Sequence, residues 1–377
     1  MMSRTFFLGV VLVATLIDAF VFSRSFFSNR EGRERIDCKT LFRAIAATTI
    51  VFVLKILVFL VLGLTAFGLI HLIYVDLVAL APALALLALF SRRKRMTLAV
   101  RLVAIVTLFA AFVGAYATFI EPFDTRLETA DVFVPSQRVG ARPIRIGVLA
   151  DIQTQGVSEH ERAAVRRLAA TNPDLVLVAG DVFQGDDESF ERALPGIRAL
   201  FAELKPPGGI FVVPGDVDVP ADRVARLGPN VTPLINRMVH VEVGDRRVTL
   251  CGIELDWTSS AVQMLLERFE FAGNSDDIRI LLAHRPDSIK DLNTFSRVDL
   301  TVAGHTHGGQ IVVPGFGPPL TLSRVPRSIA AGGLHQLDGN RIYVSRGVGC
   351  ERAQAPRIRL FCPPEITLLT IRTASPK

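Results

Sequence analysis

The sequence is poor in cysteine, and its cysteines do not form a metal-binding pattern. Only four are present among 377 residues, Cys38, Cys251, Cys350 and Cys362, and none belongs to a CxxC motif. Their spacing excludes a redox motif of that kind and a zinc cluster built on cysteine pairs. We expect buried thiols, with a disulfide between Cys350 and Cys362 as the alternative.

Most of the chain carries no excess of positive charge. The sequence has 42 Lys and Arg against 36 Asp and Glu and a pI of about 9.4. Residues 1–120 hold 13 basic and 5 acidic residues, whereas the remainder holds 29 and 31. The basic pI therefore reflects the N-terminal part, and it gives no reason to expect a nucleic-acid partner.

Long hydrophobic runs dominate the first 120 residues. Four apolar segments lie near residues 5–22, 44–66, 70–90 and 98–119. Each has the length, about 18 to 25 residues, of a helix that crosses a bilayer. The run 45–90 is too long for one crossing, and we expect it to fold as a hairpin near residues 68–74. Residues 1–120 are therefore predicted to form a transmembrane region of about four helices, with the lipid bilayer as partner.

The first apolar segment has a second interpretation, a cleaved signal peptide. The segment begins almost at Met1, contains Asp18 and lacks a small-residue cleavage site. Three more apolar segments follow it, which is unusual for a secreted protein. We therefore favour a retained helix and a multi-pass protein.

Basic residues between the apolar segments indicate the orientation. The loop after the first segment carries six Lys and Arg from Arg24 to Arg43, residues 92–95 are all basic, and the turn between the second and third segments has none. Basic loops stay in the cytoplasm. The N-terminus and the domain after residue 120 are therefore predicted to lie outside the cytoplasm, at the cell (inner) membrane.

Four ionisable residues lie in or near the apolar segments: Asp18, Lys55, Asp76 and Arg101. Such groups are costly inside a bilayer and often functional, which would indicate transport or sensing. The alternative is that the basic side chains reach the interface, while the acids lie near helix ends or pair with them.

Beyond residue 143, five short apolar runs each stop at an acid or a histidine. Runs such as Ile144–Ala150, Leu175–Ala179 and Ile210–Val213 are typical of buried strands in an α/β sheet. The residues that follow the five runs are Asp151, Asp181, Asp216, His284, His305 and His307. Ligands bind at the carboxyl ends of such strands, and carboxylate and imidazole suit Mn, Fe and Zn. The pattern predicts a site for one or two divalent metals.

Two further segments have a predictable local structure. Residues 121–142 contain prolines and glycine with little periodicity, and we interpret them as a linker with the first edge strand. Residues 158–170 are predicted to form a helix, because Ser158 and Glu161 make a capping box at its start.

The order and spacing of these blocks resemble the calcineurin-like metallophosphoesterase family, whose pattern is DxH, GD, GNHD, a lone His and GHxH. The corresponding residues are Asp151-Ile152-Gln153, Gly180-Asp181, Gly215-Asp216-Val217-Asp218, His284 and Gly304-His305-Thr306-His307. The resemblance covers roughly residues 143–372, and its tail is similar to that of membrane-tethered bacterial members. It implies an α/β fold, a four-layer sandwich of two mixed β-sheets flanked by helices, in a domain 143–377.

The resemblance also implies two divalent metal ions and their ligands. Asp181 would bridge both ions. Asp151, Gln153 and His307 would complete the first site, and Asp216, His284 and His305 the second. Asp218 and His305 would act in catalysis.

Three residues depart from the family pattern. Gln153 replaces a ligand His, Asp216 replaces a ligand Asn, and Val217 replaces the His that helps to protonate the leaving group in most relatives. The first two changes favour oxygen ligands, and hence Mn, with Mg, Fe and Zn as alternatives. Loss of the general acid that protonates the leaving group lowers the rate by about two to four orders of magnitude. This loss is smallest for leaving groups that are already stable anions, so diesters or pyrophosphates with good leaving groups are the expected substrates.

The predicted function is a membrane-anchored metal-dependent phosphoester hydrolase acting on a phosphorylated lipid or envelope substrate. Hydrolysis of UDP-2,3-diacylglucosamine in lipid A biosynthesis is one candidate that the family suggests, although that chemistry is cytoplasmic. The alternatives are a catalytically degenerate metal-binding scaffold or sensor and a transporter-like protein. Arg285, Arg346 and Arg352 are either phosphate-binding residues or ordinary ion-pair partners. The sequence does not indicate an oligomeric state.

Overall fold

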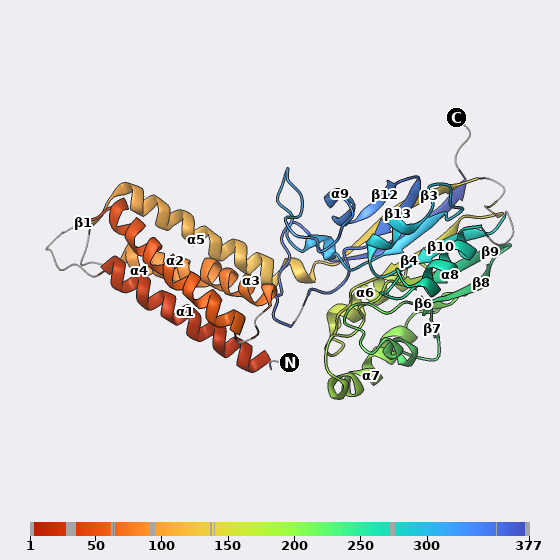
Figure 1. The fold of residues 1–377 in the computed structure, drawn as a ribbon, viewed down its shortest axis with the longest axis horizontal. Helices are drawn as coiled ribbons and strands as arrows, with labels where there is room; N and C mark the ends of the chain where they lie inside the picture. The colour runs from red at the N-terminus through yellow and green to blue at the C-terminus, as the bar shows by residue number, and fades with distance from the viewer. Residues whose placement is uncertain are drawn as a thin grey trace. The chain divides into compact units, whose positions relative to one another are not determined.

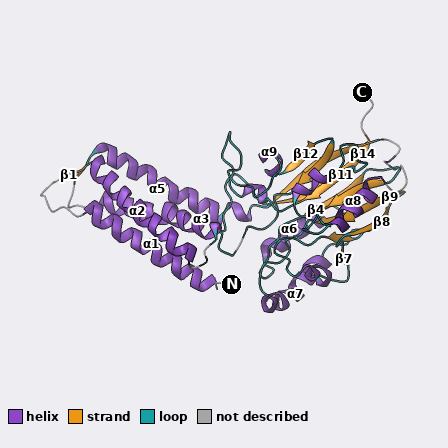
Figure 2. Cartoon of the chain, viewed as in Figure 1, coloured by secondary structure: helices purple, strands orange, loops and turns teal. Residues whose placement is uncertain are grey.

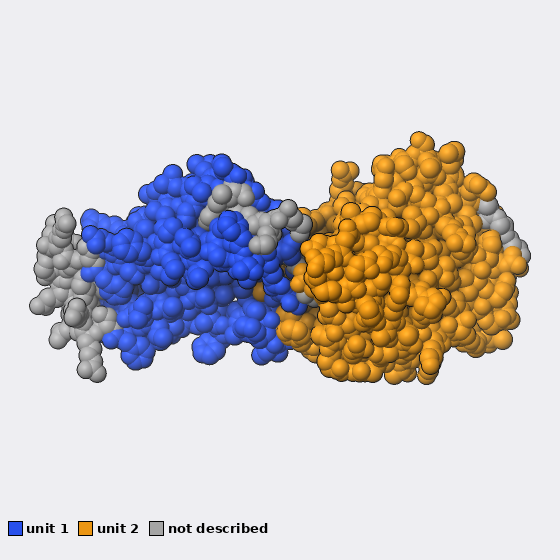
Figure 3. Space-filling model, turned by 90° about the horizontal axis from the view of Figure 1, so that it is seen from below, with its two compact units in different colours: residues 1–120, 351–357 blue, residues 121–350, 358–377 orange. Residues whose placement is uncertain are grey.

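The computed structural model describes residues 4–27, 35–61, 63, 65–90, 95–135, 138, 140–271, 276–351 and 353–373. The chain forms two compact units, coloured separately in Figure 3. The helical unit comprises residues 1–120 with 351–357, and the sheet unit comprises residues 121–350 with 358–377. Each unit has hydrophobic clusters of its own.

The helical unit is drawn in red to orange in Figure 1. Its elements are α1 (Arg4–Phe27), β1 (Arg35–Ile36), α2 (Cys38–Val61), α3 (Ala66–Val75), the π-helix η1 (Asp76–Leu80), α4 (Ala81–Phe90), β2 (Arg95–Met96) and α5 (Leu98–Phe119). Within the described residues, four helical segments are long and apolar enough to cross a membrane: Arg4–Phe27, Cys38–Val58, Ala66–Phe90 and Leu98–Phe123. The prediction of four apolar helices is confirmed.

The predicted position of the hairpin turn in the apolar run 45–90, near residues 68–74, is wrong. Residues 68–74 lie inside α3, and the chain turns between Val61, where α2 ends, and Ala66. Gly63 adopts a left-handed φ of 77°, and the Thr65 side chain caps α3 by accepting a hydrogen bond from Gly68 N–H. Gly68 is buried in the helix. Inside a helix bundle, a glycine serves close packing and does not end the helix.

The third apolar segment continues from α3 through η1 into α4 without a turn. At the junction, Ala81 N–H donates to the carbonyl of Asp76, five residues back, as in a π-helix. Pro82 explains this local widening, because its ring clashes with a regular helical turn and it has no N–H to donate. Asp76 is the first residue of η1 and belongs to this widened turn.

The sheet unit contains two six-stranded sheets in the part of the chain that is described (Figure 2). The first has the order β3-β14-β4-β5-β6-β7 and the second the order β12-β13-β11-β10-β9-β8. The strands of the first sheet are β3 (Arg126–Val134), β14 (Glu365–Thr373), β4 (Ile144–Leu149), β5 (Leu175–Val178), β6 (Ile210–Val212) and β7 (Val231–Pro233). Those of the second are β12 (Gly333–Leu337), β13 (Asn340–Val344), β11 (Leu300–Ala303), β10 (Ile278–Leu282), β9 (Arg246–Gly252) and β8 (Arg237–Val243).

Both sheets are mixed. In the first, β4 to β7 run parallel to one another and β14 pairs antiparallel with β4. In the second, β9, β10, β11 and β13 run parallel to one another, and the edge strands β8 and β12 pair antiparallel with β9 and β13. One hydrophobic cluster joins residues of both sheets, including Val148 and Leu250. Other clusters join the first sheet to α6 (Glu159–Ala169) and α7 (Asp187–Ala202), and the second to α8 (Ser260–Phe271). The unit is thus a four-layer sandwich, as predicted.

Several local predictions also hold. Helix α6 begins with the expected capping box of Ser158 and Glu161. In the segment 121–142, which contains the 3₁₀ turn η2 (Glu121–Phe123), the expected edge strand is β3, and the segment belongs to the sheet unit. In the described chain all four cysteines are free, and Cys251, Cys350 and Cys362 are buried. The interpretation as buried thiols is correct, and there is no Cys350–Cys362 disulfide.

Candidate metal centre

Strand ends from both sheets supply the candidate site. In the first sheet, the chain leaves β4, β5 and β6 toward Asp151, Asp181 and Asp216; in the second, it leaves β10 and β11 toward His284 and the pair His305 and His307. All five strands are parallel members of their sheets. The structure brings the seven predicted ligands, including Gln153, into one connected cluster.

The backbone of the site is strained in a way that points to function. Five of the seven residues have φ between 43° and 72°: Asp151, Gln153, Asp181, His305 and His307. Non-glycine residues avoid this region, and holding each one there costs about 1 to 3 kcal/mol unless the surroundings enforce it. Strained residues of this kind cluster at functional sites.

Glycines allow the loops to approach each other. A Cβ atom at Gly215 would lie 2.1 Å from Asp181 Oδ1, and one at Gly304 would lie 2.5 Å from Asp151 Oδ2. Any larger residue would displace these carboxylates. Gly215 of the Gly215–Asp218 block and Gly304 of the Gly304–His307 block are therefore required by packing against these two acids.

The first group of potential ligands consists of Asp151, Asp181 and His284, whose ligand atoms all lie within 4.8 Å of one another. All three are buried. Asp151 accepts from the backbone N–H of His305 at 2.9 Å, but burial raises the pKa of Asp151 well above its usual value. Burial also opposes ionisation of Asp181, but the charge of His284 and the hydrogen bonds from His284 and Val217 together lower the pKa of Asp181.

The second group consists of Asp216, His284 and His305. Asp216 Oδ2 lies 2.7 Å from His305 Nδ1 and 3.5 Å from His284 Nε2, and His284 Nε2 lies 3.4 Å from Asp181 Oδ2. His284 is thus common to both groups in this geometry, whereas the family pattern assigns the bridging role to Asp181. The two groups are adjacent, as a two-metal site requires.

His284 has one ring nitrogen fixed and the other available. Its Nδ1 lies 2.8 Å from the carbonyl of Ala179, so Nδ1 carries the proton of the neutral ring. Within the described residues, the buried Nε2 has no hydrogen bond. Burial disfavours a charge on this ring, but Asp181, Asp216 and Asp151 outweigh burial and raise the pKa of His284 well above its usual value. Such a ring is oriented as a metal ligand is.

His307 fits a metal ligand better than any structural role. It is buried, its Nε2 lies 3.8 Å from Asp151 Oδ1, and neither ring nitrogen has a hydrogen bond within the described chain. Burial and the charge of Arg359 lower the pKa of His307 to about 3. A neutral buried imidazole with two unused nitrogens is costly unless a cation or another donor binds there.

Gln153 reaches the site as a hydrogen-bond donor. Its Nε2 donates to Asp181 Oδ2 at 3.2 Å, and the side chain is fully buried. To ligate a metal, the amide would have to turn its oxygen toward the ion. The position is therefore as predicted, while the contact observed is to Asp181.

The Asp218 carboxylate bonds to backbone amides beside two of the predicted ligands. Its carboxylate accepts backbone N–H bonds from Gly215, Val182 and Phe183 at 3.0 to 3.2 Å. Burial and the nearby charge of Asp181 raise the pKa of Asp218 to about 6. Asp218 thus connects the loops that carry Asp181 and Asp216, and its role in catalysis stays a prediction. Val217 contributes a backbone N–H to Asp181 Oδ1 at 2.9 Å.

Arg285 compensates the charge that Asp216 adds. Its Nε lies 3.0 and 3.1 Å from the two carboxylate oxygens of Asp216, and its Nη2 lies 2.5 Å from Oδ1. Burial alone would raise the pKa of Asp216, but His284, His305 and Arg285 together hold it well below its usual range. Of the two interpretations that the sequence left open for Arg285, phosphate binding and an ion pair, the structure shows a forked ion pair with Asp216.

Arg346 and Arg359 stabilise the loops around the site. Arg346 pairs with Glu365 and Glu128, so the ion-pair interpretation of Arg346 is correct. Arg359 is fully buried and donates to backbone carbonyls, including that of His307. No sequence pattern indicated this role for Arg359. Arg352 lies outside the described residues.

The fold and the site define a hydrolase of the metal-dependent phosphoesterase class. A sequence model of the calcineurin-like phosphoesterase family matches residues 144–309. The chain is 30% identical over 206 residues to phosphodiesterase YaeI of Escherichia coli K12, covering 53% of this chain and 70% of that protein. The chain belongs to the calcineurin-like metallophosphoesterase family.

Other relatives cover more of the chain. The uncharacterized metallophosphoesterase YkuE of Bacillus subtilis is 26% identical over 271 residues, covering 69% of this chain and 90% of that protein. A Caenorhabditis elegans metallophosphoesterase is 26% identical over 276 residues, and the chain spans about half of its length, 54%. A solved dimetal phosphatase from Danio rerio aligns with 55% of this chain and 88% of its own at 13% identity and a TM-score of 0.32.

Proposed function

We propose that the protein hydrolyses phosphodiester or pyrophosphate bonds of a lipid-linked or cell-envelope substrate. The observation that carries the proposal is the cluster of three acids and three histidines where strands of both sheets end. Among the described residues, His284 Nε2 and both ring nitrogens of His307 have no hydrogen-bond partner. Asp181 is proposed as the bridging ligand. Asp151, Gln153 and His307 complete one site, and Asp216, His284 and His305 the other.

Two divalent cations bound there would polarise the phosphoryl oxygens and activate water for in-line attack. Groups of the chain itself hold the geometry: the backbone carbonyl of Ala179 orients His284, and the Arg285 side chain orients Asp216. The oxygen-rich donor set favours Mn²⁺, with Mg²⁺, Fe²⁺ and Zn²⁺ as alternatives.

The leaving group must be a good one, because Val217 cannot donate a proton. His305 lies against Asp216 through Nδ1, and its Nε2 is 3.3 Å from the Leu322 carbonyl. A stable anionic leaving group needs little protonation. We therefore expect activity to fall steeply as the pKa of the leaving group rises.

The membrane assignment supports a substrate at a surface. The four apolar helices are proposed to span the cell (inner) membrane, and the basic loops near residues 24–43 and 92–95 support an outer location of the sheet unit. A reporter that works only outside the cytoplasm should be active when fused after residue 140 and inactive at residue 94. The reverse result would favour the cytoplasmic UDP-2,3-diacylglucosamine reaction.

The competing proposal is a metal-binding scaffold that has lost catalysis. It is favoured by Gln153, Asp216 and Val217, which depart from the family pattern at three positions. The discriminating experiment measures metal content of the purified full chain, then hydrolysis of nitrophenyl diesters, monoesters and pyrophosphates with Mn²⁺, Mg²⁺, Fe²⁺ and Zn²⁺. His307→Ala should lose metal and activity, whereas His240→Ala, which removes an imidazole from β8, should retain both. Bound metal without hydrolysis of any diester would establish the scaffold.

A further inference from the structure

The helical unit contains buried ionisable side chains that the phosphoesterase reaction does not use. Asp18 of α1 forms an ion pair with Lys55 of α2, whose Nζ also donates to the Ala14 carbonyl at 2.9 Å. Asp76, at the start of η1, has its carboxyl next to Asp18. Within the described chain, Lys55 pairs with Asp18 and Asp76 has no salt bridge.

This cluster is short of hydrogen-bond donors. Asp18 is 1% exposed, and among the described residues its Oδ1, Oδ1 of Asp76 and Oγ1 of Thr15 have no hydrogen-bond partner. Buried carboxylate oxygens without donors are costly in apolar surroundings. Helix backbone N–H groups cannot help, because they already bond along the helices. A molecule that bound here would have to bring its own donor.

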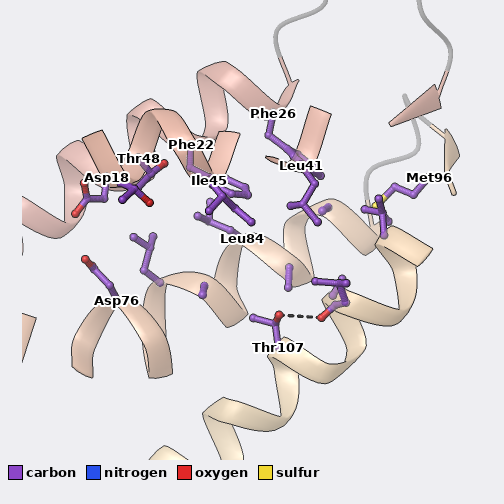
Figure 4. A pocket seen from close by; sticks show the side chains of 18 residues that line it. Asp18, Phe22, Phe26, Leu41, Ile45, Thr48, Asp76, Leu84, Met96 and Thr107 are labelled. Carbon is purple, nitrogen blue, oxygen red and sulfur yellow. Dashed lines mark hydrogen bonds between the residues drawn. The ribbon is translucent and has the colours of Figure 1, made fainter. Parts of the chain in front are cut away.

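A cavity of about 270 Å³ adjoins the two acids. Figure 4 shows Asp18 and Asp76 at one end of the lining side chains and Met96 at the other. Apolar side chains such as Phe22 and Leu84 form most of its wall. Along α1 the lining extends from Asp18 to Phe26, eight residue steps or about 12 Å of helix. The space is thus elongated and mostly apolar, with its two carboxylates at one end; the hydroxyls of Thr48 and Thr107, which also line it, already donate to carbonyls of their own helices.

We propose that this cavity binds an amphiphile with one alkyl or isoprenyl chain and a hydroxyl or amine head group, the head group bonding to Asp18 and Asp76. The apolar walls fit the chain. The acceptor-rich end selects a head group that donates hydrogen bonds and excludes carboxylate and phosphate, which would repel the acids. The site is independent of the proposed hydrolysis.

The test is photolabelling of the full-length protein in phosphatidylcholine nanodiscs. Three probes with the same diazirine-bearing chain differ only in the head group: an alcohol, an amine and a carboxylate. The alcohol, the amine or both should label peptides of α4 and α5, and the carboxylate should label them about tenfold less, which corresponds to about 1.4 kcal/mol. The probe that labels the protein more strongly, the alcohol or the amine, identifies the preferred head group.

Two variants separate the cavity from ordinary lipid contact. Ala104→Phe fills the cavity and should reduce labelling about tenfold; Ala115→Phe adds the same ring on the exposed face of the same helix and should leave it unchanged. Asp76→Asn keeps the side-chain shape, and it should weaken the amine more than the alcohol. Equal labelling by all three head groups, or no difference between Ala104→Phe and Ala115→Phe, would overturn the proposal.

Discussion

The two units each bury a cluster of charged side chains, and they stabilise it in different ways. In the sheet unit, strand ends leave backbone N–H groups free, and these donate to Asp151, Asp181 and Asp218. In the helical unit, the backbone N–H groups are used within the helices, so Asp18 depends on one side chain, Lys55. Backbone amides at a sheet edge can therefore hold several acids together, whereas the described helices give Asp18 one side-chain partner and Asp76 no salt bridge.

This difference also limits what each cluster is suited to bind. The strand-end cluster combines acids with imidazole nitrogens that have no hydrogen bond, a donor set for divalent cations. The helical cluster has carboxylate oxygens and an ammonium but no imidazole. It is suited to a hydrogen-bond donor in an apolar space.

The largest expected effect is at the proposed bridging ligand. Asp181→Asn should lose bound metal and reduce hydrolysis by about three orders of magnitude, because metal coordination supplies several kcal/mol of transition-state stabilisation. Elemental analysis and diester hydrolysis measure the two effects. Asp222→Asn, which removes one charge at an exposed position of η4 (Ala221–Arg226), is the matched control. An Asp181→Asn protein with unchanged metal stoichiometry would contradict the two-metal proposal.

The next largest effect concerns the ion pair of the helical unit. Asp18→Asn should destabilise the protein by about 3 to 5 kcal/mol, because it leaves the Lys55 ammonium buried and unpaired. The double variant Asp18→Leu with Lys55→Met removes both charges and should recover most of the stability. Unfolding of the full chain by SDS, followed by circular dichroism, measures this. If Asp18→Asn is as stable as the double variant, Lys55 does not depend on Asp18.

The pair of Asp216 and Arg285 offers a finer test of charge balance in the sheet unit. Arg285→Gln should bind the second Mn²⁺ about tenfold more tightly, since it removes a positive charge close to the cation. Asp216→Asn should bind it more weakly, and the double variant should approach the wild type. Calorimetric titration with Mn²⁺ gives the order of affinities. Weaker binding by Arg285→Gln would mean that Arg285 acts by positioning Asp216 and not by its charge.

Local sequence patterns were sufficient to predict the strand ends, because apolar runs and the residues after them are local. The partners of these residues were not predictable in the same way. Arg285 and Asp216 are 69 residues apart, and the contact of Arg359 with the His307 carbonyl joins residues 52 apart. Asp218 accepts a hydrogen bond from Val182 N–H, 36 residues away, and local spacing does not indicate this contact either. The position of the turn before α3 was not predictable from local sequence, because a glycine such as Gly68 can end a helix or lie buried inside one, and its burial depends on the tertiary fold.

The smallest expected effect concerns Glu161, a carboxylate that is not among the predicted metal ligands and accepts a backbone hydrogen bond from Ser158 N–H at the start of α6. Burial would raise the pKa of Glu161, but hydrogen bonds from the Ser158 side chain and N–H outweigh it and lower the pKa below its usual value. Because the folded pKa is lowered, this stabilisation is present above the unfolded pKa and is lost as the pH falls through the folded pKa. Glu161→Gln should therefore destabilise the first turn of α6 by about 0.5 kcal/mol at neutral pH and by less in acid. Hydrogen exchange of the α6 amides, corrected for intrinsic rates, measures the difference, with the exposed Glu159→Gln as control. A difference that is constant with pH would show that the charge of Glu161 is not what the Ser158 N–H stabilises.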